Sequence, residues 1–372
     1  MLSSEWQLQQ IRTSDVDELT IDLPGWTQRY TQLERGQFRG DLMLAHGEGV
    51  QVYREHTEGA VLQEGETNSG VLGLAIPLQA NGGVYSFGSK LSSVREVMGF
   101  FGPRRLNLRT PEQFELLVVS VQRDVLDGFE QSRQVDSRAR GRDSPIGTLP
   151  DWQRQDLVEA TQVLFLPAVD SERLARAKLH LLDCLAEALI RFEPAPRGGK
   201  ANSCRQTVDQ ALATVRTWMH ERAQTPLNVA ALCAELSLPR RTLQYSFELA
   251  LGISPLQYLK SVRLGGARRS LKQGAVSVFD ACLGWGFDHP SAFARDYHTM
   301  FGELPSQTLE RARAVGPRAT ENTTLVSPFI LQAPIRPDAI RNRWLPSQPS
   351  EWHLPPAAAD WRAPAVPPPA AR

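Results

Sequence analysis

The sequence has few cysteines, and none of them has a spacing that binds metal. The four are Cys184, Cys204, Cys233 and Cys282. They form no Cys-x-x-Cys pair and no zinc-type Cys/His pattern. Scattered cysteines with apolar neighbours are typical of reduced thiols inside the cell. We therefore expect a cytoplasmic protein with no metal and no cofactor.

Long apolar runs and an excess of charge are also missing. No stretch of 18 apolar residues could span a membrane, and the first ten residues, MLSSEWQLQQ, lack the basic and apolar parts of a signal peptide. The 41 Lys and Arg residues balance 41 Asp and Glu residues. We expect no membrane partner, and overall charge does not predict binding to a polyanion.

The 372 residues, 41% of them hydrophobic, are enough for two domains and a tail. Up to about residue 130, polar and apolar residues alternate between frequent glycines, a pattern that predicts antiparallel strands of a sandwich or a barrel. The segment FELLVVSVQRDVL, from Phe114 to Leu126, predicts a buried strand that runs into a helix. Residues 151–192 are predicted to be helical, with one leucine face. That face, which either packs within the domain or forms a dimer seam, comprises Leu174, Leu181, Leu185 and Leu189.

Composition sets the other predicted boundaries. EPAPRGGKANS (residues 193–203) has the composition of a linker, and a helical block follows over residues 204–314. Residues 201–314 contain 13 Lys/Arg and 9 Asp/Glu, a difference of 13 − 9 = +4. This modest basic excess permits nucleic-acid binding without demonstrating it. The last 58 residues hold 12 prolines and are predicted to be a disordered tail.

One small unit occurs twice in the helical block. LCAELSLPRRTLQYSF begins at Leu232 and ACLGWGFDHPSAFARDY begins at Ala281. Cys282 matches Cys233 at an offset of 282 − 233 = 49, and Gly286 matches Ser237 at the same offset. The second copy has one extra residue in its turn.

Each copy has the pattern of a helix-turn-helix. In the first, Asn228 caps a predicted helix over residues 229–236, and a second helix starts at Pro239. The second helix of such a unit enters the DNA major groove, where Arg pairs with guanine and Gln with adenine. The candidate DNA-contacting residues are Arg240, Arg241, Gln244 and Tyr245 in the first copy and His289, Ser291 and Arg295 in the second.

A single helix is predicted between the two copies, over residues 255–272. At 1.5 Å per residue it is roughly 27 Å long, against about 34 Å for one turn of B-DNA. Its apolar face carries Tyr258 and Val262, while Arg263, Arg268 and Lys272 are predicted outside that face. Such a spacer would hold the two helix-turn-helix units, which we call the two heads, near successive major-groove segments of DNA. One monomer would then read a bipartite site.

The block resembles the C-terminal domain of AraC/XylS-family transcription regulators over about 110 residues. The segments that match are RTLQYSFELALGISPLQYLKSVRL and GFDHPSAFARDYHTMFGELPSQTL. The motif residues are Leu243, Phe247, Gly252, Ser254, Pro255, Tyr258, Leu259, Arg263, Leu264, Gly286, Phe287, Phe293, Tyr297, Phe301, Gly302, Pro305 and Ser306. In this family the base-reading positions correspond to Arg241, Gln244 and Tyr245, then to Pro290, Ser291 and Arg295.

The chain departs from the family pattern in two places that bear on function. Pro239 replaces the usual serine before the first recognition helix, and Pro290 has no backbone N–H to donate. Gly265 and Gly266 are also expected to loosen the connecting helix by roughly 1 kcal/mol each.

The N-terminal half is similar to the cupin-like β-barrel sensing domain of the same family, in the subgroup that includes ethanolamine-operon regulators. The segments concerned are WTQRYTQLERGQFRGDL and FFGPRRLNLRTPEQFELLVVSV. The resemblance implies an α+β chain with a sensing and dimerisation domain over residues 1–193, a linker over 194–203, a double helix-turn-helix domain over 204–314 and a Pro-rich tail over 315–372.

The function implied is that of an activator that binds double-stranded DNA and responds to an unidentified small-molecule effector. RNA polymerase is an expected partner, through the surface at residues 302–306, and a homodimer is possible. No catalytic residues are expected. His46 and His56 lie ten residues apart, whereas a cupin metal site needs His-x-His with a nearby Glu.

The sequence also allows two other classes of protein. One is a DNA-binding module fused to a catalytic domain, either a cupin enzyme or an alkyl-transfer enzyme with an activated cysteine. The alkyl-transfer case needs a nucleophilic cysteine in a Pro/His context or a zinc-held cysteine, and Cys204, in NSCRQT within the linker, has neither context. The other class is an architectural DNA binder without an effector.

Overall fold

The N-terminal half folds into antiparallel strands, as the alternating sequence predicted. The strands are β1 (Gln7–Thr13), β2 (Trp26–Gln32), β3 (Arg39–Gly47), β4 (Val50–Glu58), β5 (Val61–Thr67), β6 (Val71–Asn81), β7 (Tyr85–Phe87), β8 (Lys90–Ser92), β9 (Glu96–Phe100), β10 (Arg104–Arg109), β11 (Gln113–Gln122), β12 (Ile146–Thr148) and β13 (Glu193–Pro194). The computed structural model describes residues 6–20, 26–67, 70–81, 85–87, 90–102, 104–133, 145–195, 199–221, 228–275 and 277–314.

These strands form two sheets rather than the closed barrel that the resemblance implied. The larger has eight strands in the order β1-β3-β4-β11-β6-β9-β12-β13, and the smaller has five in the order β2-β5-β10-β7-β8. No ladder joins the two sheets among the described strands, so the predicted barrel is not closed in this part of the chain, and its cupin-like form is not confirmed. A barrel and a pair of packed sheets have the same period-two alternation, which is why the sequence did not distinguish them.

The period of two sends neighbouring side chains of β11 into different layers. Val118 packs into the core between the two sheets, where it lies opposite Tyr53 of β4 and Ala75 of β6. Val119, next along the strand, packs into a second core that contains residues of helices. The large sheet is therefore buried on both faces, which explains why β11 reads as a nearly continuous apolar run.

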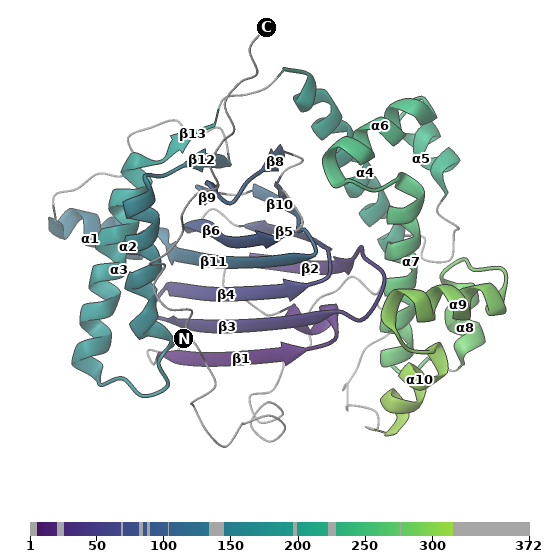
Figure 1. The fold of residues 1–372 in the computed structure, drawn as a ribbon, viewed down its shortest axis with the longest axis horizontal. Coiled ribbons are helices and arrows are strands. Elements are labelled where there is room, and N and C mark those ends of the chain that lie inside the picture. The colour runs from purple at the N-terminus through teal and green to yellow at the C-terminus, as the bar shows by residue number, and fades with distance from the viewer. Residues whose placement is uncertain are drawn as a thin grey trace, which may run out of the picture. The chain divides into compact units, whose positions relative to one another are not determined.

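Three helices cover the outer face of the large sheet, at the left of Figure 1. They are α1 (Arg123–Arg133), α2 (Asp151–Gln162) and α3 (Ser171–Arg191). The predicted passage from strand into helix is confirmed, since α1 follows β11 directly. On α3, Leu181, Leu185 and Leu189 are 0% exposed and pack within this chain. These leucines are therefore core residues and do not form a dimer seam.

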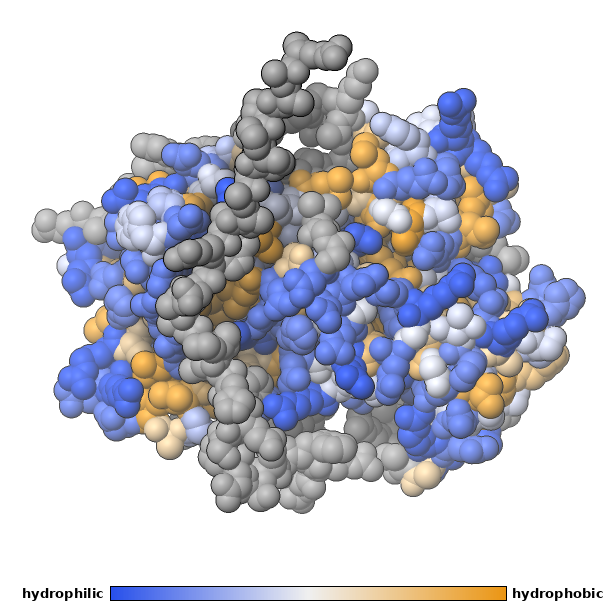
Figure 2. Space-filling view, viewed as in Figure 1, coloured by the Kyte–Doolittle hydropathy of each residue, from blue (hydrophilic) through white to orange (hydrophobic). Residues whose placement is uncertain are grey.

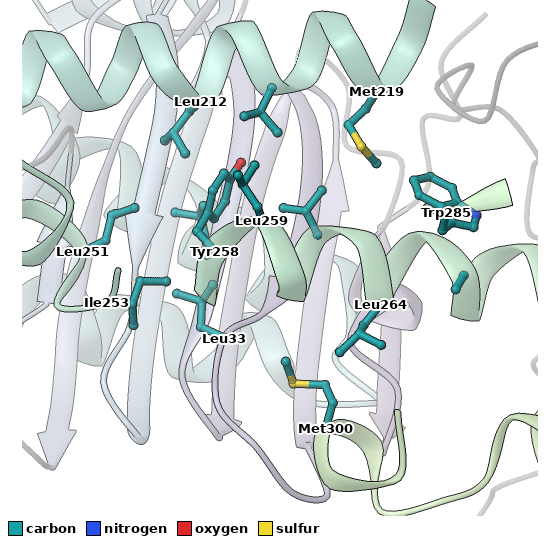
Figure 3. Close-up of a cluster of buried hydrophobic side chains, with 14 of the residues drawn as sticks. Leu33, Leu212, Met219, Leu251, Ile253, Tyr258, Leu259, Leu264, Trp285 and Met300 are labelled. Carbon is teal, nitrogen blue, oxygen red and sulfur yellow. The ribbon is translucent and has the colours of Figure 1, made fainter. Parts of the chain in front are cut away.

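The C-terminal part is all helical. Its helices are α4 (Gly199–Glu221), α5 (Val229–Glu235), α6 (Arg240–Leu251), α7 (Pro255–Lys272), α8 (Val278–Gly284), α9 (Pro290–Phe301) and α10 (Pro305–Ala314). The start of α4 lies inside the segment 194–203 that composition marked as a linker. A single core runs through these helices and includes Leu33, which comes from the end of β2 (Figure 3).

The small sheet contacts the helical part through polar as well as apolar side chains. Glu64 of β5, whose side chain is 8% exposed, pairs with Arg216 of α4 at 2.9 Å. Asn107 of β10 donates to Asp209 of α4 at 2.8 Å. Leu62 belongs to the same apolar core as the helices. The sheet and helical parts thus share a core and buried polar contacts.

The chain divides into two compact units, residues 1–329 and 330–372, and every described residue lies in the first. The predicted tail, residues 315–372, lies outside the described residues. Among the described helices, none combines the length and the apolar character that a membrane crossing requires.

Candidate nucleic-acid interface

The first helix-turn-helix unit is built from α5 and α6. The Asn228 side chain accepts a hydrogen bond from the backbone N–H of Ala231 at 2.8 Å, which caps α5 as predicted. Pro239 is the N-cap residue of α6, so this helix begins one residue later than expected. Leu243 and Phe247, one turn apart on α6, are both 0% exposed. The unit is therefore fixed by an apolar face that leaves the opposite face of α6 to solvent.

The second unit, α8 and α9, repeats this construction. Ser277 caps α8 by accepting from the N–H of Asp280 at 3.0 Å. Phe293 and Tyr297 repeat the spacing of the buried pair in α6 and are also 0% exposed. Cys282 is buried, and its thiol donates to the backbone carbonyl of Phe287 at 3.2 Å.

The backbone confirms the duplication. Helix α8 starts 278 − 229 = 49 residues after α5, and α9 starts 290 − 240 = 50 residues after α6, so the turn of the second copy is one residue longer. Ser237 and Gly286 both have positive φ, at 52° and 69°. Gly252 and Gly302 end α6 and α9 with φ of 66° and 71°, a conformation that glycine adopts without a steric penalty.

The predicted contact residues of the first unit lie on or beside the open face of α6. Arg240, Arg241 and Tyr245 are exposed, and Tyr245 is 59% exposed. Gln244 is half-buried, and its amide donates to Glu248 one turn later at 2.5 Å. A base edge would therefore have to replace the Glu248 carboxylate as the partner of this amide.

The predicted residues of the second unit lie at the start of α9. His289 is the N-cap residue, Ser291 lies in the first turn, and Arg295 lies one turn further on; all three are exposed. Pro290 occupies the first helical position, where the N–H that proline lacks would have no partner within the helix. The structure thus brings each predicted set together on its own helix. Hydrophilic residues cover much of the helical region on the face in Figure 2.

Helix α7 connects the units and spans the predicted residues, Pro255 to Lys272. Arg263 fixes it to the second unit, because its guanidinium donates to the carbonyl oxygens of Trp285, at 2.9 Å, and of Gly286. The same guanidinium lies 4.2 Å from the centre of the Phe287 ring. This arginine supports the second turn and does not project toward a ligand.

The other basic residues of α7 are not free, contrary to the expectation that they lie outside its packed face. Arg269 pairs with Asp17 at 3.0 Å, and Lys272 pairs with Asp15 at 2.6 Å. Arg268, whose side chain is 7% exposed, pairs with Asp15 at 3.6 Å. Both aspartates belong to the segment at the short helix η1 (Val16–Leu19), about 250 residues away in sequence. No sequence pattern near α7 could have revealed these partners.

The pKa of Asp17 reflects this pairing. Burial alone would raise the pKa of this carboxyl group, but the nearby positive charges of Arg269, Lys272 and Arg268 outweigh burial and hold the pKa below its ordinary value of 3.8. Asp17 is therefore ionised at neutral pH and bound to the connecting helix.

The sheet domain also holds α9 directly. The backbone N–H of Gly36, in the turn after β2, donates to the carbonyl oxygens of Thr299 and Met300 at 3.1 and 3.2 Å. The side-chain amide of Gln32 donates to Met300 at 2.8 Å. The last turn of α9 is thus bonded to the sheet domain.

Cys184 and Cys282 do not have the environment of an activated nucleophile, although the Cys184 sulfur lies 3.8 Å from the ring nitrogens of His180. Burial raises the pKa of the Cys184 thiol to about 11, and burial also raises the pKa of the Cys282 thiol. A raised pKa disfavours the thiolate that alkyl transfer requires. Among the described residues, no group of three or more His, Cys, Asp or Glu side chains is placed to hold a metal ion.

Comparison with known proteins identifies this part of the chain. Residues 232–311 match the helix-turn-helix domain. The chain is 29% identical over 191 residues to the probable thc operon regulatory protein of Rhodococcus erythropolis, covering 48% of this chain and 54% of that protein. It is 31% identical over 130 residues to the HTH-type transcriptional regulator CdhR of Pseudomonas aeruginosa, a match that covers 35% of this chain and 37% of that protein. The chain thus spans about half or less of the length of these curated relatives.

A solved structure, that of a probable AraC family transcriptional regulator from Rhodopseudomonas palustris, is 37% identical. The match covers 28% of this chain and 98% of that one, with a TM-score of 0.26. With its helix-turn-helix match, its similarity to these two curated regulators and its doubled helical unit, the chain belongs to the AraC/XylS family of transcriptional regulators.

Proposed function

We propose that this chain is a sequence-specific DNA-binding regulator in which one monomer reads a bipartite site. The observation that carries the proposal is the doubled unit. Helices α6 and α9 have 12 residues each, carry two buried aromatic or leucine side chains four positions apart, and end at a glycine. Each helix also leaves polar side chains exposed. A second copy with an open polar face gives a second place at which a base sequence can be read.

The side chains suit the base edges of the major groove. Arg241 is proposed to contact guanine O6 and N7, and Gln244 to contact adenine N6 and N7. Arg240 and Tyr245 are proposed to contact the phosphate backbone or neighbouring bases, because they lie exposed on the same helix. In the second unit, Ser291 and Arg295 are proposed to read bases, with His289 beside them at the helix start.

The length of α7 supports simultaneous reading by both heads. Its 18 residues make it roughly 27 Å long, somewhat less than the ~34 Å of one DNA turn. A rigid connection of that size allows the heads to enter successive major-groove segments on one face of the duplex. Linking two weak heads raises the overall affinity through their effective concentration.

The remaining parts of the proposal concern regulation. The family resemblance favours activation, with RNA polymerase as a partner at residues 302–306. We propose that the sheet domain responds to a small-molecule effector and takes part in a homodimer. The bonds from the sheet domain to α7 and α9 support an effector response, because a shift in this domain would move both heads.

The test is a genome-wide pull-down of bound DNA fragments with the parent chain and two double variants. We expect Arg241→Ala/Gln244→Ala to abolish enrichment that depends on one short sequence box. Ser291→Ala/Arg295→Ala should abolish the dependence on a second box about one helical turn away. Each lost bidentate contact corresponds to about 1–3 kcal/mol, or roughly 5- to 150-fold in affinity for the matching box.

The matched control is Arg176→Ala, which removes an exposed arginine from α3, on the outer face of the large sheet. It should leave both boxes and the affinity unchanged. Binding without sequence preference in the parent chain would refute sequence-specific reading. Loss of both boxes in either double variant, with the fold intact, would refute the assignment of one box to each head.

A further inference from the structure

A cavity of about 160 Å³ lies where the sheet domain meets the connecting helix and the second recognition helix. The turn after β2 contributes Arg35, α7 contributes Lys260 and Ser261, and α9 contributes Arg295. The volume corresponds to about five water molecules at roughly 30 Å³ each. The cavity therefore suits a small molecule of a few heavy atoms.

The charged side chains of the cavity are mostly positive. Arg35, Lys260 and Arg295 line it together with one carboxylate, Asp296, so their formal sum is 3 − 1 = +2. Lys260 pairs with Asp296 at 2.7 Å. Within the part of the chain that the structure describes, neither Arg35 nor Arg295 has an ion-pair partner. Two guanidinium groups thus remain available for an anion.

A buried hydroxyl group supports the same interpretation. Ser261 is 2% exposed and lines the cavity. Its hydroxyl oxygen has no hydrogen-bond partner among the residues described. Buried polar groups in proteins are nearly always hydrogen-bonded, because an unsatisfied buried group is costly. An oxygen atom of a bound anion would accept a hydrogen bond from this hydroxyl.

We propose that this cavity binds a small dianion with carboxylate or phosphate oxygens, such as a phosphate monoester or a dicarboxylate. Guanidinium groups bind such oxygens with paired, charge-assisted hydrogen bonds. The charge of the ligand would balance the +2 of the lining, and the Ser261 hydroxyl would bind one further oxygen.

The regulatory consequence rests on the function proposed above. Arg295 is a proposed base-reading residue, and it lies one turn before the residues of α9 that accept hydrogen bonds from Gly36. An anion held by both Arg35 and Arg295 would engage the reading guanidinium and tie α9 more firmly to the sheet domain. The anion is therefore expected to weaken binding to the second DNA box.

Binding is tested first without DNA, by calorimetric titration of the full chain at pH 8. Inorganic phosphate and succinate are the two probes, and sodium chloride holds the ionic strength constant. We expect saturable binding of at least one probe with a Kd of about 1 mM, an affinity that a few charge-assisted hydrogen bonds can supply. Binding of phosphate alone would assign the phosphate class, and binding of succinate alone would assign the dicarboxylate class.

The variants locate the binding site. Arg35→Gln and Lys260→Gln should each weaken binding about tenfold, whereas Arg39→Gln, outside the cavity, should not change it. Equal melting temperatures would show that the variants keep the fold. No saturable binding of either probe up to about 20 mM, or equal Kd values in all variants, would overturn the site.

A second titration measures DNA affinity with and without the anion at constant ionic strength. The parent chain should lose affinity for a two-box fragment when the anion is present, and Arg35→Gln should keep its affinity. If the calorimetric result holds but no sequence-specific DNA binding exists, the anion site stands and only the proposed function fails. If specific DNA binding exists without any anion effect, the regulatory role is refuted.

Discussion

The two adjacent glycines of α7 should respond in opposite directions to the same substitution. A Cβ atom on Gly266 would lie 2.3 Å from ring atoms of Trp285. That ring is 6% exposed, and its N–H donates to the Ser270 hydroxyl at 2.9 Å, so it has little room to move. A Cβ atom on Gly265 would meet only the guanidinium end of Arg269, at 3.5 Å.

The magnitudes follow from two effects. Replacing glycine by alanine inside a helix gains about 1 kcal/mol at either position, because the unfolded chain loses conformational freedom. At Gly266 the added methyl group also overpacks the core, at a cost of about 3 kcal/mol, the upper end of the usual range. Gly265→Ala should therefore stabilise the protein by about 1 kcal/mol and Gly266→Ala should destabilise it by about 2 kcal/mol.

Urea unfolding followed by circular dichroism measures both variants beside the parent chain. The expected difference of about 3 kcal/mol between them corresponds to a clear separation of midpoints at typical m-values. Because Trp285 belongs to the turn of the second unit, Gly266→Ala should also weaken binding to DNA that contains both boxes. Gly265→Ala should leave this binding unchanged.

Equal midpoints for the two variants would refute the close packing of α7 against Trp285. The same conclusion would follow if Gly266→Ala were as stable as the parent chain. In either case the expected loss of DNA affinity in Gly266→Ala would have no structural basis.

Three further predictions concern single residues. Ser237→Gly should stabilise the first unit by about 0.5–1 kcal/mol in thermal unfolding, because φ is +52° at this serine and glycine adopts positive φ without strain. Burial raises the pKa of Glu55 to about 7 from 4.5, although its hydrogen bond from Tyr30 lowers the pKa. Between these two pH values the folded state therefore binds more protons than the unfolded state, so the free energy of unfolding should fall as pH rises from 4.5 to 7. Glu55→Gln should remove this pH dependence. An unchanged pH dependence in the variant would contradict the role given to Glu55. Asp17→Asn should lower the unfolding temperature at pH 7. Since the pKa of Asp17 is lowered in the folded state, its contribution should disappear as pH falls below that pKa, and an equal cost of the substitution at all pH values would exclude the ion pair as its cause.

The sequence by itself determined the local construction of the helical part. Caps, apolar spacing and turn glycines act over a few residues, so the bounds of α7 and the duplication at offsets of 49 and 50 could be derived without a structure. The same holds for the alternation in the strands. Apart from the half-buried Gln244, the predicted contact residues of the two heads are also exposed, because burial of the opposite face decides which side of a helix is open.

Only the tertiary structure decided which distant residues meet. Alternation fits a barrel and two packed sheets equally, so the ladders between strands had to be seen. The basic residues of α7 were expected to be free, yet Asp15 and Asp17, about 250 positions away, bind them. The anion cavity likewise combines Arg35 with Lys260 and Arg295. Local sequence fixes periodicity and caps, whereas such partnerships depend on how the sheet domain packs against the helices, which no short-range pattern encodes.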